Sequence, residues 1–564
     1  MLTKSNTKRH AFNSPFWHKL FGTNPTNNGM QPKEALSYSL AGLGQNLICG
    51  LVGSFVSYYF TNGLLLAPIT VGYIMLGVRI FDALNDPIMG SIVDRTRTKN
   101  GKCRPYLKWM PIPIAILTVL LFLPLNPSGT SASIGLIVII TLLYTVWSVA
   151  YTIVDVPYWG LSNGMTEDTH QRGTMLTVAR LMCTLGAGVI AILIPLVSGA
   201  WISQFADSTG QIISGQEGNA ALALQHNFWW LAIIVVGIAI PTFWVGYKNS
   251  KERFYDDSKA LPLKENLKLI VKNKPLLIVI FSGFLGAARG LFLYGGIYFA
   301  TYNLAAAGVT ILGMKGTQLA LIVTMAIVPG GLIASLLVPY FTRKVGKRNT
   351  FIWSHIICGA LFLICYICGA DGRWQENWVL IVTLIGLLII GIPTGFSNII
   401  TYAMIADTVD WLELHEGVRA EGICFSIQTL LNKIGMAFGA AFSCFALGWA
   451  HINPMKADTF TVTGNPSGLQ LFFDLCVLIP AISTILCALP LFFYKFQEKQ
   501  QGHTVKILQA RKGINEAGVF IGRDESNPLL LEDPLNERFK KLTAEGKFAV
   551  VKSVDTSKDN NDNE

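Results

Sequence analysis

Asp82, Asp86 and Asp155 lie well inside long apolar stretches of the sequence, where a charge is costly. Arg79, Asp82 and Asp86 stand at i, i+3 and i+7 in the apolar stretch 69–93, so a helix would place them along one stripe. A charged side chain at the centre of a bilayer costs about 2.5–3.5 kcal/mol on the more lenient scale, so each one needs a partner or a function. Asn85 adds an amide oxygen next to Asp86. These residues predict an oxygen-lined site for a hard cation.

The third carboxylate belongs to a polar and aromatic face in the apolar stretch 134–161. Tyr151, Asp155 and Trp159 stand at i, i+4 and i+8, which stacks a phenol, a carboxylate and an indole on one side of a helix. Three carboxylates on neighbouring helices repel one another unless a cation or protons neutralise them. A bound Na⁺ or H⁺ is the simplest neutralising partner. The alternative is that a carboxylate of the first group only pairs with Arg79.

Two further cations in apolar stretches of the chain are candidates for contact with a ligand. These are Arg180 and Lys433, and Lys433 follows the polar residues Gln428 and Thr429 by about one helical turn. Such groups bind the hydroxyls of a sugar, while an aromatic face such as that of Trp159 covers its apolar side. An alternative role for Lys433 is an ion pair with a carboxylate of the first half of the chain that stabilises one conformation. Both roles can coexist in one protein.

The composition identifies the elements that must position these side chains. Charged residues make up 14% of the 564 residues and hydrophobic residues 51%, whereas soluble domains average about 25% charged residues. This composition excludes a soluble, disordered or collagen-like protein and predicts an all-α protein that crosses the membrane several times. Twelve apolar stretches have the length of a membrane-spanning helix: 36–61, 69–93, 107–126, 134–161, 174–198, 228–247, 276–303, 317–341, 351–369, 378–405, 423–450 and 470–494.

Basic residues are distributed unevenly over the loops between these stretches. One side of the predicted membrane carries the N-terminal segment and the basic loops 94–106, 248–275 and 342–350, and the other side has very few Lys or Arg residues. Because Lys and Arg next to a span are retained in the cytoplasm, we expect a multi-pass protein of the cell membrane with both termini cytoplasmic. The net charge of +10 is then a topological signal, and no nucleic-acid partner is expected.

The loop 248–275 divides the twelve stretches into two groups of six. A basic loop follows the second stretch of each group, which indicates an internal repeat; the alternative is two ordinary basic cytoplasmic loops. Two related six-helix halves with the substrate bound between them resemble the major facilitator architecture. The expected parts are a cytoplasmic leader 1–35, an N-terminal half 36–247, a central loop 248–275, a C-terminal half 276–495 and a polar cytoplasmic tail 496–564.

The cysteines and the tail do not suggest further chemistry. Nine of the ten cysteines lie in apolar stretches and are interpreted as small buried hydrophobic residues, so no metal site or cofactor is expected beyond the coupling cation. The polar tail is expected to be a solvated regulatory or disordered extension. A functional monomer is expected within the lipid bilayer.

Two sequence motifs carry a family resemblance. The runs DALNDPIMG at 82–90 and YTIVDVPYW at 151–159 resemble the signatures of the glycoside-pentoside-hexuronide:cation symporters, the melibiose permease-like branch of the major facilitator superfamily, and the resemblance covers about 36–495. It implies a cation site made of Asp82, Asn85, Asp86, Thr152 and Asp155. It also implies a substrate site that includes Asn46, Tyr151, Asp155, Trp159, Arg180, Gln428, Thr429 and Lys433.

The chain departs from the family pattern in its first apolar stretch. Where melibiose permease has a lysine followed by a sugar-binding aspartate, this sequence has Gln45 and Asn46. Asn46 can hydrogen-bond hydroxyls in both directions, but it lacks the charge-assisted bonds of a carboxylate. The resemblance therefore implies a glycoside other than an α-galactoside, a pentoside or a uronide.

The predicted function is cation-coupled symport of a sugar or glycoside by alternating access. Cation binding orders Asp155 for the sugar, and charged residues form and break contacts as the halves move. These gating candidates are Arg79, Asp94, Arg95, Arg97, Arg289, Arg343 and Arg348, of which Arg289 is interpreted as part of a structural or gating pair. The alternatives are a lysolipid:cation symporter of the same fold and a membrane sugar sensor that signals through the tail. An enzyme is not indicated, because no nucleophile–base constellation occurs.

Overall fold

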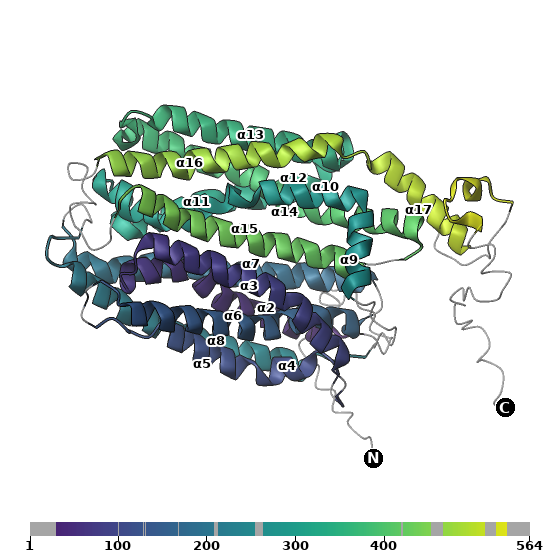
Figure 1. Ribbon diagram of the computed structural model, residues 1–564, viewed down its shortest axis with the longest axis horizontal. Coiled ribbons are helices and arrows are strands. Elements are labelled where there is room, and N and C mark those ends of the chain that lie inside the picture. The colour runs from purple at the N-terminus through teal and green to yellow at the C-terminus, as the bar shows by residue number, and fades with distance from the viewer. Residues whose placement is uncertain are drawn as a thin grey trace, which may run out of the picture.

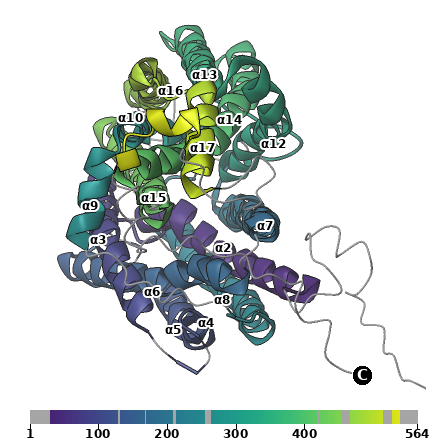
Figure 2. The same cartoon turned by 90° about the vertical axis from the view of Figure 1, so that its right-hand side faces the viewer.

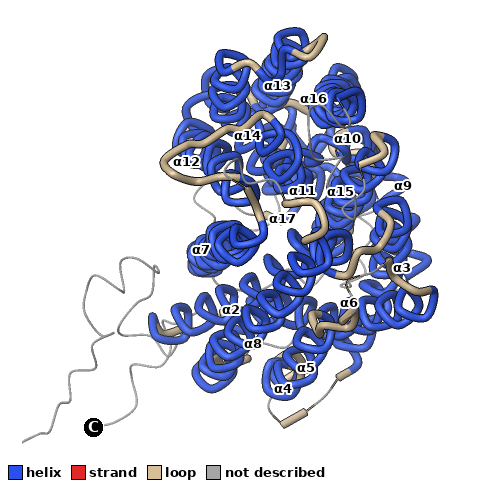
Figure 3. The backbone as a smooth tube through the Cα atoms, turned by 90° about the vertical axis from the view of Figure 1, so that its left-hand side faces the viewer, coloured by secondary structure: helices blue, strands red, loops and turns tan. Residues whose placement is uncertain are grey.

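The computed structural model describes residues 30–537 except 97, 100, 128, 130, 167–168, 208–211, 254–262, 419–420, 453–465 and 514–525. Helices dominate this part of the chain, and its β-type pairs are two isolated bridges, Ala206 with Ile212 and Ile311 with Met314 (Figure 3). Almost all of the expected leader, the gating candidate Arg97 and the end of the polar tail lie outside the described residues.

The described part of the first half of the chain forms seven α-helices. These are α2 (Pro32–Tyr58), α3 (Pro68–Arg95), α4 (Arg104–Trp109), α5 (Pro111–Leu121), α6 (Ile134–Met165), α7 (Thr169–Ile202) and α8 (Glu217–Asn249). Several begin with a proline in the first turn, where the missing N–H has no partner to lose. The third apolar stretch is therefore divided into the short helices α4 and α5, because Pro111 starts a new helix after Met110.

The helices after α8 begin with a short amphipathic helix that lies within the expected central loop 248–275. These are α9 (Leu263–Lys272), α10 (Lys274–Leu285), α11 (Leu291–Tyr298), α12 (Leu319–Val345), α13 (Lys347–Gly369), α14 (Asn377–Glu416), α15 (Glu421–Trp449) and α16 (Pro466–Ala488). The seventh apolar stretch is bent by 43° between Lys274–Leu285 and Ala287–Leu304. A further helix, α17 (Glu498–Lys512), lies in the polar tail.

Seven helices of the described chain are long and apolar enough to cross a membrane, and the bent pair makes an eighth. Large apolar side chains on their outer faces are exposed, among them Ile134 of α6, Leu185 of α7 and Trp353 of α13. An apolar outer surface of this kind is suited to lipid rather than water. The all-α membrane fold is thus confirmed, while the number of twelve spans stays a prediction.

The long helices lie side by side along the longest axis of the molecule, in two groups that follow the order of the chain (Figure 1). Within the first group, α2 packs against α7 and α8, and α3 packs against α6; within the second, α12 packs against α14, and α13 against α14 and α16. The groups meet where α3 packs against α15 and α7 against α12. Figure 2 shows the same two groups from one end of the bundle.

Ion pairs and hydrogen bonds gather the basic loops at one end of the bundle, which we call the basic end. Glu34, in the first turn of α2, binds Arg253 after α8 at 2.7 Å. Glu252 accepts a hydrogen bond from the backbone N–H of Cys103. In the second half, Lys347 at the start of α13 binds Asp407 of α14 at 2.6 Å.

Two π-helical segments join the halves at the opposite end. The helix α2 continues as the π-helix Tyr59–Gly63, and α11 continues as the π-helix Phe299–Leu304. The hydroxyls of Thr61 and Tyr298 lie 3.0 Å apart, and the amide of Asn62 donates to the hydroxyl of Tyr302 at 2.7 Å. π-helical turns are frequent at functional sites, and these two lie where the halves are in contact.

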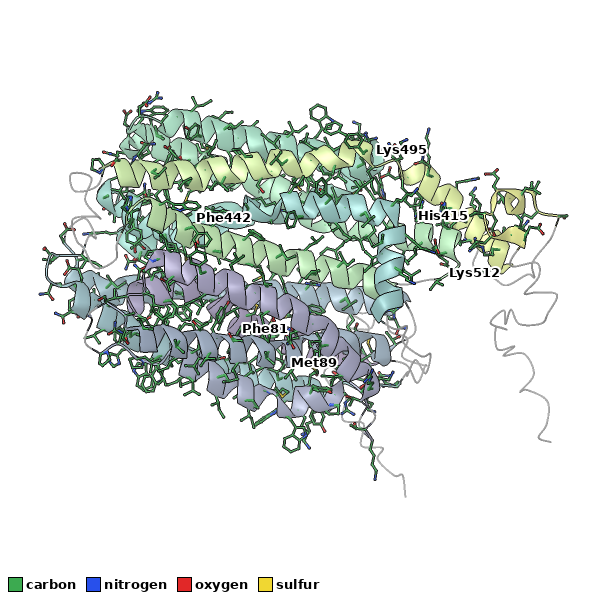
Figure 4. The ribbon with its side chains drawn as sticks, in the orientation of Figure 1. Phe81, Met89, His415, Phe442, Lys495 and Lys512 are labelled. Carbon is green, nitrogen blue, oxygen red and sulfur yellow. The ribbon has the colours of Figure 1, made fainter. Side chains whose placement is uncertain are left out.

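The first part of the polar tail is folded, so the disordered alternative is wrong for this part, while the regulatory alternative stays a prediction. The guanidinium of Arg511 in α17 is 2% exposed and donates to both carboxylate oxygens of Asp533, at 2.8 and 2.5 Å. It also donates to the backbone carbonyls of Glu413 and Leu414 at the end of α14. Figure 4 shows Lys512 of α17 and His415 of α14 at the same end of the molecule, and the ammonium of Lys512 lies 2.5 Å from a carboxylate oxygen of Glu413. Tertiary contacts therefore hold this segment against the helical bundle.

Candidate cation and substrate site

The predicted site residues lie near the middle of the bundle, because each comes about halfway along its helix. Asp82 and Asp86 belong to α3, Thr152 and Asp155 to α6, and Lys433 to α15. The packing of α3 against both α6 and α15 brings these three helices together. The first and second halves of the chain therefore both contribute to one buried polar cluster.

The carboxylates of α3 are held by a hydroxyl and two cations. The hydroxyl of Thr152 lies 2.8 Å from Oδ1 of Asp82 and 3.2 Å from Oδ1 of Asp86. The ammonium of Lys433 lies 2.6 Å from Oδ1 of Asp86 and 3.3 Å from Oδ2 of Asp82. Arg79 is farther away, with its Nη1 3.8 Å from Oδ2 of Asp82. Two negative and two positive charges thus meet in a site where Asp82 is only 2% exposed.

Lys433 forms an ion pair with carboxylates of the first half, which is one of the two roles that the sequence suggested for it. Its contact with Asp82 is shorter than that of Arg79, so the carboxylates do not pair with Arg79 alone. An ammonium has three donors and no acceptor, and it approaches carboxylate oxygens at the position that a hard cation would take. The ammonium of Lys433 therefore occupies the place between the two carboxylates in this conformation.

Asp155 is held by different partners. Its Oδ1 accepts hydrogen bonds from the amide of Gln45 and from the indole N–H of Trp159, the latter at 3.1 Å. The amide nitrogen of Gln45 also lies 3.4 Å from the hydroxyl of Tyr151. The predicted face of phenol, carboxylate and indole on α6 is thus present, and Asp155 is buried within it.

Arg180 of α7 extends this face toward the second half. Its guanidinium lies 4.1 Å from the ring centroid of Trp159 and 5.6 Å from that of Tyr402 in α14. The hydroxyl of Tyr402 in turn accepts a hydrogen bond from the amide of Asn432 at 3.1 Å. Contact with aromatic faces positions a guanidinium without using all of its N–H groups, so some of them can donate to a polar ligand. Tyr402 was not predicted, since a lone tyrosine in an apolar stretch carries no signal of its own.

Not every predicted substrate or cation residue joins the cluster. The amide of Asn46 donates to the carbonyl of Gly42, one turn earlier in the same helix. The Nδ2 atom of Asn85 is buried without a hydrogen-bond partner in the described part of the chain. The side chains of Gln428 and Thr429 lie outside the described residues.

The structure places the gating candidates in varied surroundings, and their role stays a prediction. Arg289 contacts His355 at 3.2 Å, within the second half. Arg348 donates to the carbonyls of Leu491 and Phe492, at 3.0 and 2.9 Å. The side chains of Arg95 and Arg343 are exposed, and that of Asp94 lies outside the described residues.

The described helices share their fold with solved membrane transporters. A solved structure of the nucleoside transporter NupG aligns with a TM-score of 0.53 at 14% identity, covering 82% of this chain and 98% of that one. The crystal structure of a D-xylose-proton symporter also aligns with a TM-score of 0.53 at 14% identity, covering 83% and 98%. At this identity the likeness supports the fold alone.

The sequence comparison identifies the family. The family described as MFS/sugar transport protein matches residues 37–498, and the chain belongs to it. The isoprimeverose transporter of Lactiplantibacillus pentosus is 29% identical over 471 residues, which cover 82% of this chain and 88% of that protein. The glucuronide carrier protein homolog of Escherichia coli (strain K12) is 24% identical over 499 residues, which cover 87% and 98%. The resemblance to the glycoside-pentoside-hexuronide symporters is thereby confirmed.

Proposed function

We propose that the protein is a secondary active transporter that carries a sugar or glycoside across the membrane together with a cation, by alternating access. The observation that supports this most directly is the contact of Lys433 with Asp82 and Asp86, because it joins the two halves through buried charges. In a carrier whose halves move relative to each other, contacts of this kind form or break when the ligands bind.

The cation is proposed to bind at the carboxylates of α3. Oxygens of Asp82, Asp86 and Thr152 converge there, and oxygen ligands suit Na⁺ while the carboxylates suit H⁺. A cation that binds between the carboxylates replaces the ammonium of Lys433 and frees the second half to move. Because binding free energies are reciprocal, a cation that favours the sugar-binding conformation is itself bound more tightly when the sugar is present.

The sugar is proposed to bind beside the cation, at the face of Asp155, Trp159 and Arg180. These side chains supply a carboxylate acceptor, an aromatic surface and a guanidinium donor, which together suit a pyranose with its hydroxyls. The similarity to an isoprimeverose transporter and to a glucuronide carrier homolog favours a glycoside over a lysolipid. We further propose that the basic end faces the cytoplasm, that the chain forms two six-helix halves and that the monomer is the functional unit.

Uptake into proteoliposomes tests this function. The purified protein is given methyl α-galactoside, methyl β-glucoside, methyl β-xyloside or methyl β-glucuronide, with an inward Na⁺ gradient at equal pH or an inward proton gradient without Na⁺. We expect one class of glycoside to accumulate above equilibrium under one of the two gradients. Accumulation of none under either gradient contradicts the proposal.

The variant Asp86→Asn tests the cation site. It should abolish accumulation while leaving equilibration down a sugar gradient. The matched control is Asp474→Asn, which changes a carboxylate of α16 that is bound by Gln470 at 2.7 Å, away from the cluster. Retained uphill uptake in Asp86→Asn, or equal loss in both variants, excludes Asp86 from the cation site.

A further inference from the structure

Two cations at the basic end of the first half approach the same aromatic ring. Arg104 and Lys108 stand at i and i+4 on α4, which packs against α8 at the edge of the bundle (Figure 1). The ring centroid of Tyr247 in α8 lies 5.1 Å from the guanidinium of Arg104 and 5.9 Å from the ammonium of Lys108. Arg104 also donates to the backbone carbonyl of Tyr247 at 3.0 Å. Two positive charges therefore gather at one place on the surface of the first half.

The protein supplies no anion to these two cations in its described part. Like charges one helical turn apart destabilise a helix unless an anion compensates them. Neither Arg104 nor Lys108 makes an ion pair with a described residue. The carboxylate of Glu252 comes near the start of α4, but it accepts from the backbone N–H of Cys103 at 3.0 Å. The Nε–H group of Arg104 is buried without an acceptor among the described residues.

The surroundings of the two cations are those of a membrane–water interface. The ring of Trp109 is 65% exposed, and its centroid lies 4.6 Å from the ammonium of Lys108. Trp244 of α8 is also exposed, and its indole N–H donates to the backbone carbonyl of Lys108. Ile112 and Ile116 continue the exposed surface along α5, one turn apart. Because tryptophan rings gather at the level of the lipid headgroups, the cations lie at that level and the isoleucines beside the acyl chains.

We propose that Arg104 and Lys108 bind the phosphate group of an anionic phospholipid from the leaflet at the basic end, with an acyl chain along Ile112 and Ile116. A guanidinium and an ammonium both donate to phosphate oxygens, and basic sites at the membrane surface attract anionic headgroups. A zwitterionic headgroup carries its own ammonium, which Lys108 repels. A free phosphate ion gains nothing from the apolar surface beside the cations.

The lipid site is separate from the proposed sugar and cation site. It belongs to α4, α5 and α8, and none of these helices contributes a residue to the central cluster around Lys433. Its test therefore measures lipid binding and does not depend on transport.

Native mass spectrometry of the full chain in detergent tests the site. The probes are palmitoyl-oleoyl phosphatidylglycerol and palmitoyl-oleoyl phosphatidylcholine, a zwitterionic lipid with the same acyl chains. The proteins are wild type, Lys108→Gln and the double variant Arg104→Gln/Lys108→Gln. The matched control is Lys495→Gln/Lys499→Gln, which removes two exposed cations near the start of α17.

We expect wild type to bind phosphatidylglycerol more tightly than phosphatidylcholine. Lys108→Gln should weaken the binding of phosphatidylglycerol about fivefold and the double variant about 25-fold, as expected for the loss of one and two cations beside an anionic headgroup. The binding of phosphatidylcholine should change little, and the control should bind both lipids as wild type does.

Photolabelling places the lipid on the surface of the protein. A phosphatidylglycerol with a diazirine in one acyl chain should label residues within 104–116 or 238–248 of wild type, and the double variant should lose this labelling. An excess of inorganic phosphate at constant ionic strength should leave the labelling in place, because the acyl chain contributes to binding.

Four results overturn the proposal. Equal binding of phosphatidylglycerol by wild type and the double variant excludes the two cations. An equal loss in the control means that the basic end attracts anionic lipids only through its overall charge. An equal loss for both lipids indicates a purely structural role. Labelling elsewhere, or its suppression by phosphate, excludes a lipid at this position.

A second variant keeps the test valid if the double variant does not elute as a folded protein. Arg104→Gln removes a hydrogen bond to the carbonyl of Tyr247, whereas the ammonium of Lys108 contacts only the rings of Trp109 and Tyr247. Lys108→Glu therefore replaces the double variant. It should weaken the binding of phosphatidylglycerol more than Lys108→Gln does, because it adds an anion beside the phosphate.

Discussion

Lys433 of the second half lies 2.6 Å from Asp86 of the first half, although 347 residues separate them in the chain. Both side chains lie at the contact of α15 with α3, and Asp82 is the second carboxylate within reach of the same ammonium. A buried ion pair is weak evidence for stability as a whole, but the loss of one partner leaves the other charge without compensation. The pair is therefore a sensitive point at which to perturb the protein.

Replacing Lys433 by glutamine should destabilise the protein without a bound cation by about 3–5 kcal/mol, because two buried carboxylates are then left with Arg79 alone. Thermal unfolding in detergent measures this effect, and addition of the coupling cation should restore much of the loss. Lys272→Gln is the control, since Lys272 is 56% exposed in its pair with Glu416 and such pairs contribute about 0–1 kcal/mol. Equal effects of the two substitutions would contradict the prediction.

Trp159 combines a hydrogen bond to Asp155 with a face that carries Arg180, and two substitutions separate these roles. Trp159→Phe keeps an aromatic face but removes the indole N–H, and it should lower kcat/KM for sugar uptake about tenfold. Trp159→Ala removes both and should lower it further. Trp244→Phe is the control, because its N–H donates to the carbonyl of Lys108 near the basic end. Equal activity of Trp159→Phe and wild type would show that the hydrogen bond from Trp159 to Asp155 is not needed for sugar uptake.

The hydrogen bond between Asn62 and Tyr302 should hold the π-helical end of α2 closed. Tyr302→Phe removes the accepting hydroxyl, so the amides of Tyr59–Gly63 should exchange with deuterium several-fold faster, as expected for a loss of about 1 kcal/mol. Hydrogen–deuterium exchange with mass spectrometry measures this. Tyr144→Phe is the control, since the hydroxyl of Tyr144 has no partner among the described residues. Unchanged exchange in Tyr302→Phe would show that this bond does not limit opening.

Arg511 should be required for the tail to stay on the bundle. Arg511→Met leaves Asp533 buried and unpaired, which costs about 3–5 kcal/mol and should release α17. Limited proteolysis should then cut within 498–512 at a protease concentration that leaves wild type intact. Lys499→Met, which changes an exposed cation of the same helix, should leave the pattern unchanged. Protection of α17 in the Arg511 variant would mean that the apolar contacts of Ile507 and Leu508 suffice.

Local patterns were sufficient for much of the fold. Apolar stretches marked the long helices, and the spacing of Asp82 and Asp86 placed both on the same side of α3, where Thr152 and Lys433 meet them. The division of the third stretch at Pro111 is a local signal as well, because proline favours the first turn of a helix, but hydrophobicity alone does not reveal it.

Contacts between residues far apart in the chain could not be predicted from the sequence. The sequence predicts Asn46 rather than Gln45 as the polar contact of α2, because a polar residue in an apolar helix does not reveal which neighbouring helix it faces. Arg511 looked like one more solvated charge of a polar tail, and only its tertiary partners Asp533, Glu413 and Leu414 explain its burial. In both cases the partner lies tens to hundreds of residues away, beyond any local pattern.

The charge balance of the central cluster has an electrical consequence. With all carboxylates ionised, the cation cluster and the neighbouring polar face together hold three negative and three positive side chains, namely Asp82, Asp86 and Asp155, and Arg79, Arg180 and Lys433. In the proposed symport cycle, the empty carrier then moves no net charge at this site, and the carrier loaded with one cation and a neutral sugar moves one. Moving one elementary charge across a membrane potential of 100 mV changes its free energy by about 2.3 kcal/mol. The voltage would therefore drive the loaded step of the cycle and leave the return of the empty carrier unaffected.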